Sequence, residues 1–351
     1  MRQLLTRSQV IVCLGPGGVG KTTTAAAIAL AGARRGRRAV VLTIDPAHRL
    51  ADAVGLSDGL TNEPRQLDGA WSGELWAAML DPRVTFEAII NAQSKDSGQA
   101  ERILSNRLFQ HLTSSLSGTN EFMASERLLD LHLDPRFDLV VIDTPPSRHA
   151  VDFLDSPDRL VRFVDHRLYR TVLAPQRGLR GVMNAAGQMA VRTMGRVVGS
   201  DLLTDVIEFF NAFQGMDEGF RQRASRSAEI LRSAATGYVL VTSPRSDPID
   251  AARWLATAMA DRQLPVALVI ANRLTPQELV GPHRIRADST AALDVNLAQL
   301  ATLARAERDL IEALGRELAL PTSLVDEQTI PVSSLAAIAI IADQLDDLPE
   351  G

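Results

Sequence analysis

The chain has 351 residues, of which 46% are apolar, and its formal net charge is −5. This length suits one large α/β domain or two smaller ones, each with a sizeable core. A slightly acidic chain lacks the broad basic surface that binds nucleic acid or anionic lipid, so we expect no nucleic-acid partner. The single cysteine, Cys13, excludes an intrachain disulfide and a zinc site built from paired CxxC motifs.

The amino-terminal segment, MRQLLTRSQVIVCLG, leads directly into a short apolar run. It has no signal-peptide h-region and no small-residue cleavage site. No stretch reaches the roughly 18 uninterrupted apolar residues that a membrane-spanning helix needs. We therefore expect a cytoplasmic protein without an integral membrane segment.

Short runs rich in β-branched residues recur along the chain and alternate with helical patterns. Several runs are almost wholly apolar, which is typical of strands buried on both faces of a parallel sheet. Alternation with helices predicts right-handed crossovers and an α/β fold with a doubly wound, mostly parallel sheet. The expected strands are 10–14, 39–45, 75–81, 137–143, 237–242 and 265–272, with a seventh near 323–326.

Longer helical stretches interrupt this alternation twice, at about 83–135 and at about 150–235. We expect a single domain over residues 1–351, in which these two insertions form a helical subdomain at one edge of the sheet. Residues 274–290 are polar and contain two prolines, so they are predicted to form a surface loop. Further helices are predicted at 291–318 and 332–346.

The segment from Gly15 to Thr22, GPGGVGKT, matches the phosphate-binding pattern GxxxxGK[ST]. It follows an apolar strand and opens an alanine-rich helix, which is the context that the pattern requires. Backbone N–H groups of such a loop surround phosphate oxygens, and the helix N-terminus adds partial positive charge. Lys21 is expected to reach the β- and γ-phosphates, and Thr22 to ligate Mg²⁺. The predicted nucleotide-binding residues of this P-loop are Gly15, Gly17, Gly18, Val19, Gly20, Lys21, Thr22 and Thr23.

A carboxylate stands at the end of another apolar run, FDLVVID, which closes with Asp143. A carboxylate at the carboxyl end of a strand beside a P-loop holds Mg²⁺, usually through water. Alone, the pattern is weak, because such an aspartate can also cap a helix. Beside the P-loop it predicts a metal site formed by Thr22 and Asp143. The sequence therefore predicts a P-loop NTPase fold with ATP and Mg²⁺ as cofactors.

Three further segments narrow the type of ATPase: TIDPAHRLADAVG (43–55), LWAAMLDP (75–82) and DTPPSRHAVDFLDSP (143–157). Together with GPGGVGKTTTAAAIAL, they resemble the ArsA-type ATPase family, which contains arsenite-pump ATPases and ATPases that guide tail-anchored membrane proteins. The resemblance extends through most of the chain, to VIANRL at 269–274. It implies an ATP-hydrolysing dimeric switch that handles a hydrophobic protein client.

The resemblance also implies roles for residues outside the P-loop. Asp45 corresponds to the switch I carboxylate that positions the attacking water, and residues 143–149 correspond to switch II. Asn272 corresponds to the side chain that hydrogen-bonds the adenine edge. Lys21 and Asp45 are thus the expected catalytic residues. From the residues alone, Asp45 could instead cap the following helix, and Asn272 could cap a loop.

The chain departs from the family pattern at Pro16. The family's P-loop normally reads GKGGxGK[ST], and its first lysine reaches across the dimer to the partner's nucleotide. Either a sister subunit that carries the lysine supplies this charge, or Arg148 or Arg49 replaces it, so a homodimer and a heterodimer both remain open. A related actinobacterial paralogue type shares the TIDPA, DTPPSR and DFLD runs and also lacks the lysine, which favours a heterodimer.

Other functions remain open beside client handling. The chain could be a regulatory nucleotide-binding subunit of a heterodimer, or an arsenite-like anion transport subunit. The latter is disfavoured because soft metalloids need clustered thiolates and only Cys13 is present. A partitioning ATPase is disfavoured because no basic patch or membrane-targeting C-terminal helix is apparent. Residues 166–200, with six arginines and helically spaced methionines, either line a client groove or pack on the core or on a partner subunit.

Overall fold

The computed structural model describes residues 1–45, 49–106, 119–165, 215–276, 292–328 and 332–346. The chain divides into two compact units. The first comprises residues 1–80, 130–151 and 230–351, and it contains the sheet. The second comprises 81–129 and 152–229, and its described elements are helices. Both stretches of the second unit overlap the ranges in which the sequence predicts helical insertions.

An eight-stranded sheet forms the centre of the first unit, in the order β3-β4-β2-β5-β1-β6-β7-β8. Every pairing is parallel except that of β3 with β4, which is antiparallel. This arrangement confirms the predicted α/β fold with a mostly parallel sheet. The strands are β1 Val10–Leu14, β2 Arg38–Thr43, β3 Arg65–Leu67, β4 Glu74–Met79, β5 Leu139–Asp143, β6 Thr236–Thr242, β7 Val266–Leu274 and β8 Thr322–Asp326.

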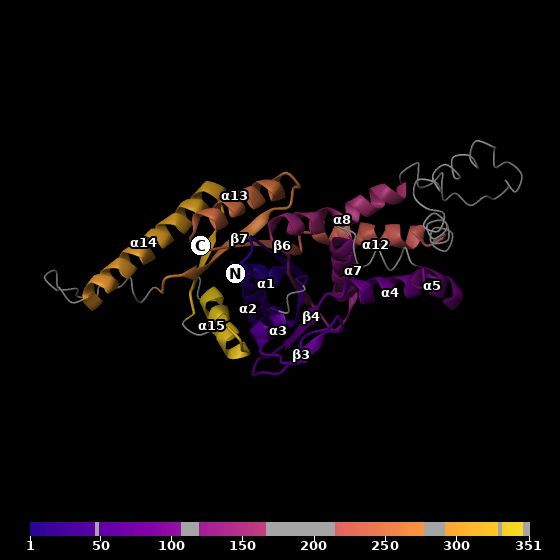
Figure 1. The fold of residues 1–351 in the computed structure, drawn as a ribbon, viewed down its shortest axis with the longest axis horizontal. Helices are drawn as coiled ribbons and strands as arrows, with labels where there is room; N and C mark the ends of the chain where they lie inside the picture. Colours follow the sequence, from indigo (N-terminus) through magenta and orange to yellow (C-terminus); the bar gives the residue numbers. More distant parts are fainter. Residues whose placement is uncertain (46–48, 107–118, 166–214, 277–291, 329–331, 347–351) are drawn as a thin grey trace, which may run out of the picture. The chain divides into compact units, whose positions relative to one another are not determined.

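Helices of the first unit cover both faces of this sheet (Figure 1). Helices α2, α3 and α15 pack together on one face, where the odd-numbered side chains of β1, β2 and β5 meet them in the core. Helices α13 and α14 pack against β6, β7 and β8. The helices are α1 Arg2–Arg7, α2 Lys21–Arg34, α3 Arg49–Val54, α13 Ser246–Ala260, α14 Ala292–Leu318 and α15 Leu335–Asp346.

The second unit contains α4 Pro82–Gln93 and α5 Ser97–Leu104. Three helices continue from one unit into the other: α7 Thr119–Leu133, α8 Ser147–Asp165 and α12 Asp217–Arg232. Within the second unit, the carboxylate of Glu126 on α7 pairs with Arg223 on α12 at 2.5 Å. Residues 166–200, which carry the predicted methionine stripe, lie outside the described residues. Among the helices that are described, none is both long and apolar enough to cross a bilayer.

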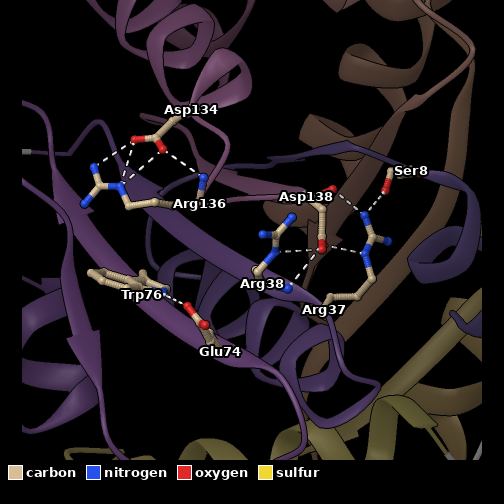
Figure 2. Close-up of polar contacts among 8 residues, drawn as sticks. All are labelled: Ser8, Arg37, Arg38, Glu74, Trp76, Asp134, Arg136 and Asp138. Atoms are coloured by element: carbon tan, nitrogen blue, oxygen red, sulfur yellow. Dashed lines mark hydrogen bonds and ion pairs between the residues drawn. The ribbon is translucent and has the colours of Figure 1, made fainter.

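Arg37 joins several elements at the amino-terminal edge of the sheet (Figure 2). Its guanidinium donates to the carbonyl of Leu5 at 2.6 Å, to the carbonyl of Ser8 at 3.1 Å and to the carboxylate of Asp138 at 2.7 Å. Leu5 belongs to α1, Ser8 caps the end of α1, and Asp138 directly precedes β5. This junction holds the amino-terminal ends of β1, β2 and β5 together. The carboxyl ends of the same strands carry the site described below.

Candidate nucleotide-binding site

The predicted site residues converge at the carboxyl edge of β1, β5 and β2. The strand register places Cys13 beside Asp143, and Asp143 beside Thr43. Because the three strands are parallel, the loops that follow them meet at the same edge of the sheet, where open α/β folds bind ligands. The P-loop follows β1, the predicted switch I follows β2, and the predicted switch II follows β5.

The P-loop leads into α2, whose first residue is Lys21. Gly20 precedes it with a φ of +88°, a left-handed conformation that favours glycine. A Cβ atom at this position would lie 2.2 Å from Nδ2 of Asn272, so a larger residue would also clash. Thr22 and Thr23 follow in the first turn of α2, and both are partly buried. The N-terminus of α2 is therefore presented as a phosphate-binding loop requires.

Lys21 folds back over the P-loop, where its Nζ donates to the carbonyl of Pro16 at 2.8 Å. The residue is only 8% exposed. Burial lowers the pKa of its amine, and the nearby carboxylates of Asp143 and Asp45 oppose this effect. The structure thus brings the P-loop lysine and the two predicted carboxylates into one electrostatic neighbourhood.

Asp143 is the central polar residue of the site and is 1% exposed. Its Oδ2 accepts hydrogen bonds from the hydroxyls of Thr22, at 2.7 Å, and Thr43, at 2.8 Å. Its Oδ1 is buried without a hydrogen-bond partner in the part of the chain that the structure describes. Burial raises the pKa of Asp143 to about 6, against the lowering effect of the two hydroxyls and of Lys21. A buried carboxylate oxygen without a partner is costly, so it is a strong acceptor for a cation or its bound water.

These residues fit Mg²⁺. The cation prefers oxygen ligands and commonly takes only one or two from the protein, with the rest from water and substrate phosphates. The Thr22 hydroxyl and the Asp143 carboxylate are oxygen ligands of this kind. Among the described residues, no cluster of three or more His, Cys, Asp or Glu side chains could hold a metal ion.

Thr43 was not predicted as a site residue. It is the last residue of β2, and its hydroxyl both donates to Asp143 and accepts from the backbone N–H of Asp45 at 3.2 Å. It therefore links the predicted metal-binding carboxylate to the predicted switch I carboxylate. The available signal was a polar, β-branched residue at the end of an apolar strand, next to the motif DPAH.

Asp45 lies just beyond the end of β2. The strand ends at Thr43, two residues earlier than predicted. One of its carboxylate oxygens pairs with Nη1 of Arg49, the first residue of α3, at 3.2 Å. Residues 46–48, between the two partners, lie outside the described residues. Asp45 is thus held at the carboxyl edge by its backbone bond to Thr43 and by the ion pair with Arg49.

The segment after β5 is hydrogen-bonded to the segment after β1. The hydroxyl of Thr144 donates to the carbonyl of Cys13 at 2.7 Å, and the N–H of Ser147 donates to the carbonyl of Gly15 at 3.1 Å. Pro146 lies beside Gly17, where an added Cβ would be 3.8 Å from its ring. The side chain of Arg148 lies outside the described part. The predicted switch II is therefore coupled directly to the P-loop backbone.

Asn272 lies near the end of β7, in contact with the P-loop, and is 6% exposed. Its Nδ2 donates to the carbonyl of Val19 at 2.9 Å, and its Oδ1 accepts from the N–H of Arg273 at 2.9 Å. Arg273 adopts a φ of +64°, which is uncommon for a residue other than glycine. The bond to Val19 was not anticipated from the sequence. The adenine contact of Asn272 stays a prediction.

Comparison with known proteins agrees with this geometry. A family model described as anion-transporting ATPase matches residues 8–288. An uncharacterized protein of Streptomyces coelicolor is 27% identical over 273 residues, which are 77% of this chain and 63% of that protein. The ATPase ASNA1 homolog 1 of Paramecium tetraurelia is 32% identical over 152 residues, 41% of this chain and 42% of that protein.

The ATPase get3 of Neurospora crassa is 30% identical over 146 residues, which are 42% of this chain and 42% of that protein. The matched segments thus span less than two thirds of the length of each of these relatives. The family model, in contrast, covers well over half of this chain and includes the P-loop, both predicted switches and Asn272. The chain therefore belongs to the anion-transporting ATPase family, ArsA, as its motifs predict.

Proposed function

We propose that this chain is a Mg-ATP-binding and hydrolysing switch ATPase. The observation that carries the proposal is the arrangement around Asp143. Two hydroxyls, from Thr22 and Thr43, donate to one oxygen of this buried carboxylate, while its other oxygen is buried without a hydrogen-bond partner among the described residues. This arrangement supports a cation that is shared between the protein and the phosphates of a nucleotide.

Hydrolysis at this site requires positioning more than acid–base chemistry. The oxygen of a water molecule bonds to the γ-phosphorus as the bond to the β–γ bridging oxygen breaks, ADP leaves with that electron pair, and a proton of the water is released. In this proposal, Lys21 holds the β- and γ-phosphates, and Asp45 orients the water by accepting its hydrogen bond. Mg²⁺, held by Thr22 and Asp143, would neutralise charge on the phosphate oxygens.

A dimeric switch that acts on a hydrophobic protein client is the role proposed for this activity, on the motif resemblance stated above. One structural feature supports it. Helix α8 starts at Ser147, whose N–H is bound to the P-loop carbonyl of Gly15, and the same helix continues into the second unit. A change of the P-loop on hydrolysis would therefore act on a helix of the proposed client-handling subdomain.

Pro16 supports a second candidate, a regulatory subunit that binds nucleotide but needs a sister subunit for turnover. The carbonyl of Pro16 accepts from Lys21, and its ring offers no charge to a partner's nucleotide. Anion transport of the arsenite type is less well supported. Cys13 is buried within β1, and burial raises the pKa of its thiol, so it is a poor metalloid ligand.

The test is steady-state ATPase activity of the purified chain, together with its molar mass from light scattering in ATP and in ADP. An active chain with an ATP-dependent dimer is the expected result. Lys21→Ala should lower turnover about a hundredfold or more, because it removes a charge aimed at the transferred phosphoryl group. Nearly normal hydrolysis by that variant would contradict the proposal. A wild-type chain that binds ATP as an inactive monomer would instead support the regulatory-subunit candidate.

A further inference from the structure

Arg49 is an exposed cation on the predicted switch I side of the site. It is the first residue of α3, and its side chain is 60% exposed. Within the described residues, its side chain makes one polar contact, from Nη1 to Oδ2 of Asp45 at 3.2 Å. The contact uses one arm of the guanidinium, although this group can present two parallel donors to an anion.

The position of Arg49 is set by the same edge of the sheet that carries the phosphate-binding loop. Asp45, its partner, is bonded through its backbone to Thr43, and Thr43 is bonded to Asp143. The charge of Arg49 also reaches the P-loop, because it contributes to the lowered pKa of Lys21, after the larger effect of burial. Arg49 and Lys21 therefore place two cations near one site.

A solvent-exposed, single-armed ion pair is weak, typically 0 to about 1 kcal/mol. A phosphate group offers a guanidinium two oxygens and more negative charge than one carboxylate oxygen, so it should compete successfully for Arg49. We propose that Arg49 binds the terminal phosphate of a nucleoside triphosphate and, in doing so, exchanges away from Asp45. This inference rests on the proposed function.

The exchange would have two consequences for hydrolysis. When a triphosphate is bound, the carboxylate oxygen of Asp45 that contacts Arg49 in the free protein would exchange this contact for a hydrogen bond from the attacking water. The chain would also supply from its own switch I a cation that its P-loop lacks at Pro16. Both consequences depend on the third phosphate, so Arg49 would distinguish ATP from ADP.

The experiment compares the binding of Mg-AMP-PNP, a non-hydrolysable triphosphate, with that of Mg-ADP by isothermal titration calorimetry. Arg49→Ala should weaken AMP-PNP binding about tenfold, which corresponds to about 1.4 kcal/mol, and change ADP binding less than twofold. Arg49→Lys should fall between the wild type and Arg49→Ala, because it keeps the charge but loses the two-armed geometry. Arg83→Ala is the matched control: Arg83 is 72% exposed and also forms one i,i+4 ion pair, with Glu87.

Asp45→Asn gives a second readout, independent of turnover. In Asp45→Asn the partner of Arg49 carries no charge, so Arg49 gives up a weaker contact when it binds the terminal phosphate. AMP-PNP should therefore bind as tightly as to the wild type or tighter. Equal losses for ADP and AMP-PNP in Arg49→Ala would show a structural role and overturn the proposal, as would no loss at all. A wild-type chain that binds neither nucleotide would instead refute the proposed function. Thermal denaturation of each variant verifies folding.

Discussion

At the residue scale, Asn272 joins β7 to the P-loop. Its amide donates to Val19 on the P-loop and accepts from Arg273, whose backbone is in the left-handed region. Gly20 leaves the space that this amide fills. The family resemblance assigns Asn272 to the adenine edge, whereas the structure shows a bond to the P-loop backbone. The two roles are compatible, and they predict different losses when the side chain is removed.

Asn272→Ala should weaken phosphate binding as well as base recognition. The substitution leaves the carbonyl of Val19 and the N–H of Arg273 without their partner, which should lower the free energy of unfolding by about 1–3 kcal/mol. Inorganic tripolyphosphate has no base, so its affinity reports on the P-loop alone. We expect the variant to bind both ATP and tripolyphosphate more weakly in calorimetric titrations with Mg²⁺.

An unchanged tripolyphosphate affinity, with only ATP weakened, would mean that Asn272 acts on the adenine and that the bond to Val19 contributes little. Asn272→Asp is the matched variant. It keeps the size of the side chain and the acceptor for Arg273 but removes the amide donor to Val19. If the P-loop bond matters, this variant should also lose tripolyphosphate affinity.

At the element scale, the sequence predicts most of the sheet because its central strands are buried on both faces. All five residues of β1 and of β5 are buried, so β1 is an unbroken apolar run and β5 is apolar up to its last residue, Asp143. Strand β3 was missed, since it has only three residues and two of them are exposed. The predicted strand 75–81 ends early because Asp81 caps α4, accepting from the N–H groups of Arg83 and Val84.

The residues of the site likewise fall into those that the sequence predicts and those that it does not. The P-loop and Asp143 could be predicted because each motif contains its own chemistry in a few consecutive residues. The roles of Thr43 and of the Asn272–Val19 bond could not, because they join residues 100 and 253 positions apart in the chain. Such contacts depend on strand order and register. The sequence predicts parallel strands here, but it does not show which strands are neighbours.

The neighbouring arginines at the start of β2 allow a prediction for the opposite edge of the sheet. Arg37 is 21% exposed at its side chain and donates to Leu5. It also donates to Ser8 and Asp138 (Figure 2). Arg38 is 47% exposed, and its Nε lies 3.4 Å from Asp138. Arg37→Ala should lower the free energy of unfolding by about 2–3 kcal/mol, because it removes charged hydrogen bonds to three segments.

Arg38→Ala is the matched control, since it removes the same charge from the adjacent position, and Arg38 pairs with the same carboxylate, Asp138. An exposed ion pair contributes little, so its loss should be below about 1 kcal/mol. Urea denaturation followed by circular dichroism gives both values. Equal losses in the two variants would show that the charge of this edge matters, and not the specific bonds of Arg37.

At the scale of the whole molecule, a buried carboxylate at the end of a central strand links global stability to function. Asp143 belongs to β5, which lies between β2 and β1, and it is buried with one carboxylate oxygen unpartnered in the described part. Thr22 at the end of the P-loop and Thr43 at the end of β2 both donate to its carboxylate. The loop after β5 is the predicted switch II, which leads into α8 and is hydrogen-bonded to the P-loop. Ionisation of Asp143 should therefore lower the stability of the free protein and raise its affinity for Mg-nucleotide.

The pH dependence of unfolding tests this opposition. The pKa of Asp143 is raised from 3.8 to about 6 by burial, so between these values the folded chain binds a proton that the unfolded chain does not. The contribution of this group to the free energy of unfolding should therefore increase as pH falls from 7.5 to 5, by about 1 kcal/mol. Urea denaturation in EDTA measures it as the difference between the wild type and Asp143→Asn, which cannot titrate.

Mg-nucleotide binding should change in the opposite direction, because Mg²⁺ must displace the proton of Asp143. Below pH 6, calorimetry should show that the affinity of the wild type for Mg-ATP falls as Asp143 becomes protonated. One such protonation lowers the association constant by at most about tenfold per pH unit. Asp143→Asn should bind weakly at every pH in this range. If the difference in stability between the wild type and Asp143→Asn instead decreased as pH fell, the pKa of Asp143 would be lowered by folding and not raised, and the predicted opposition between stability and affinity would be wrong.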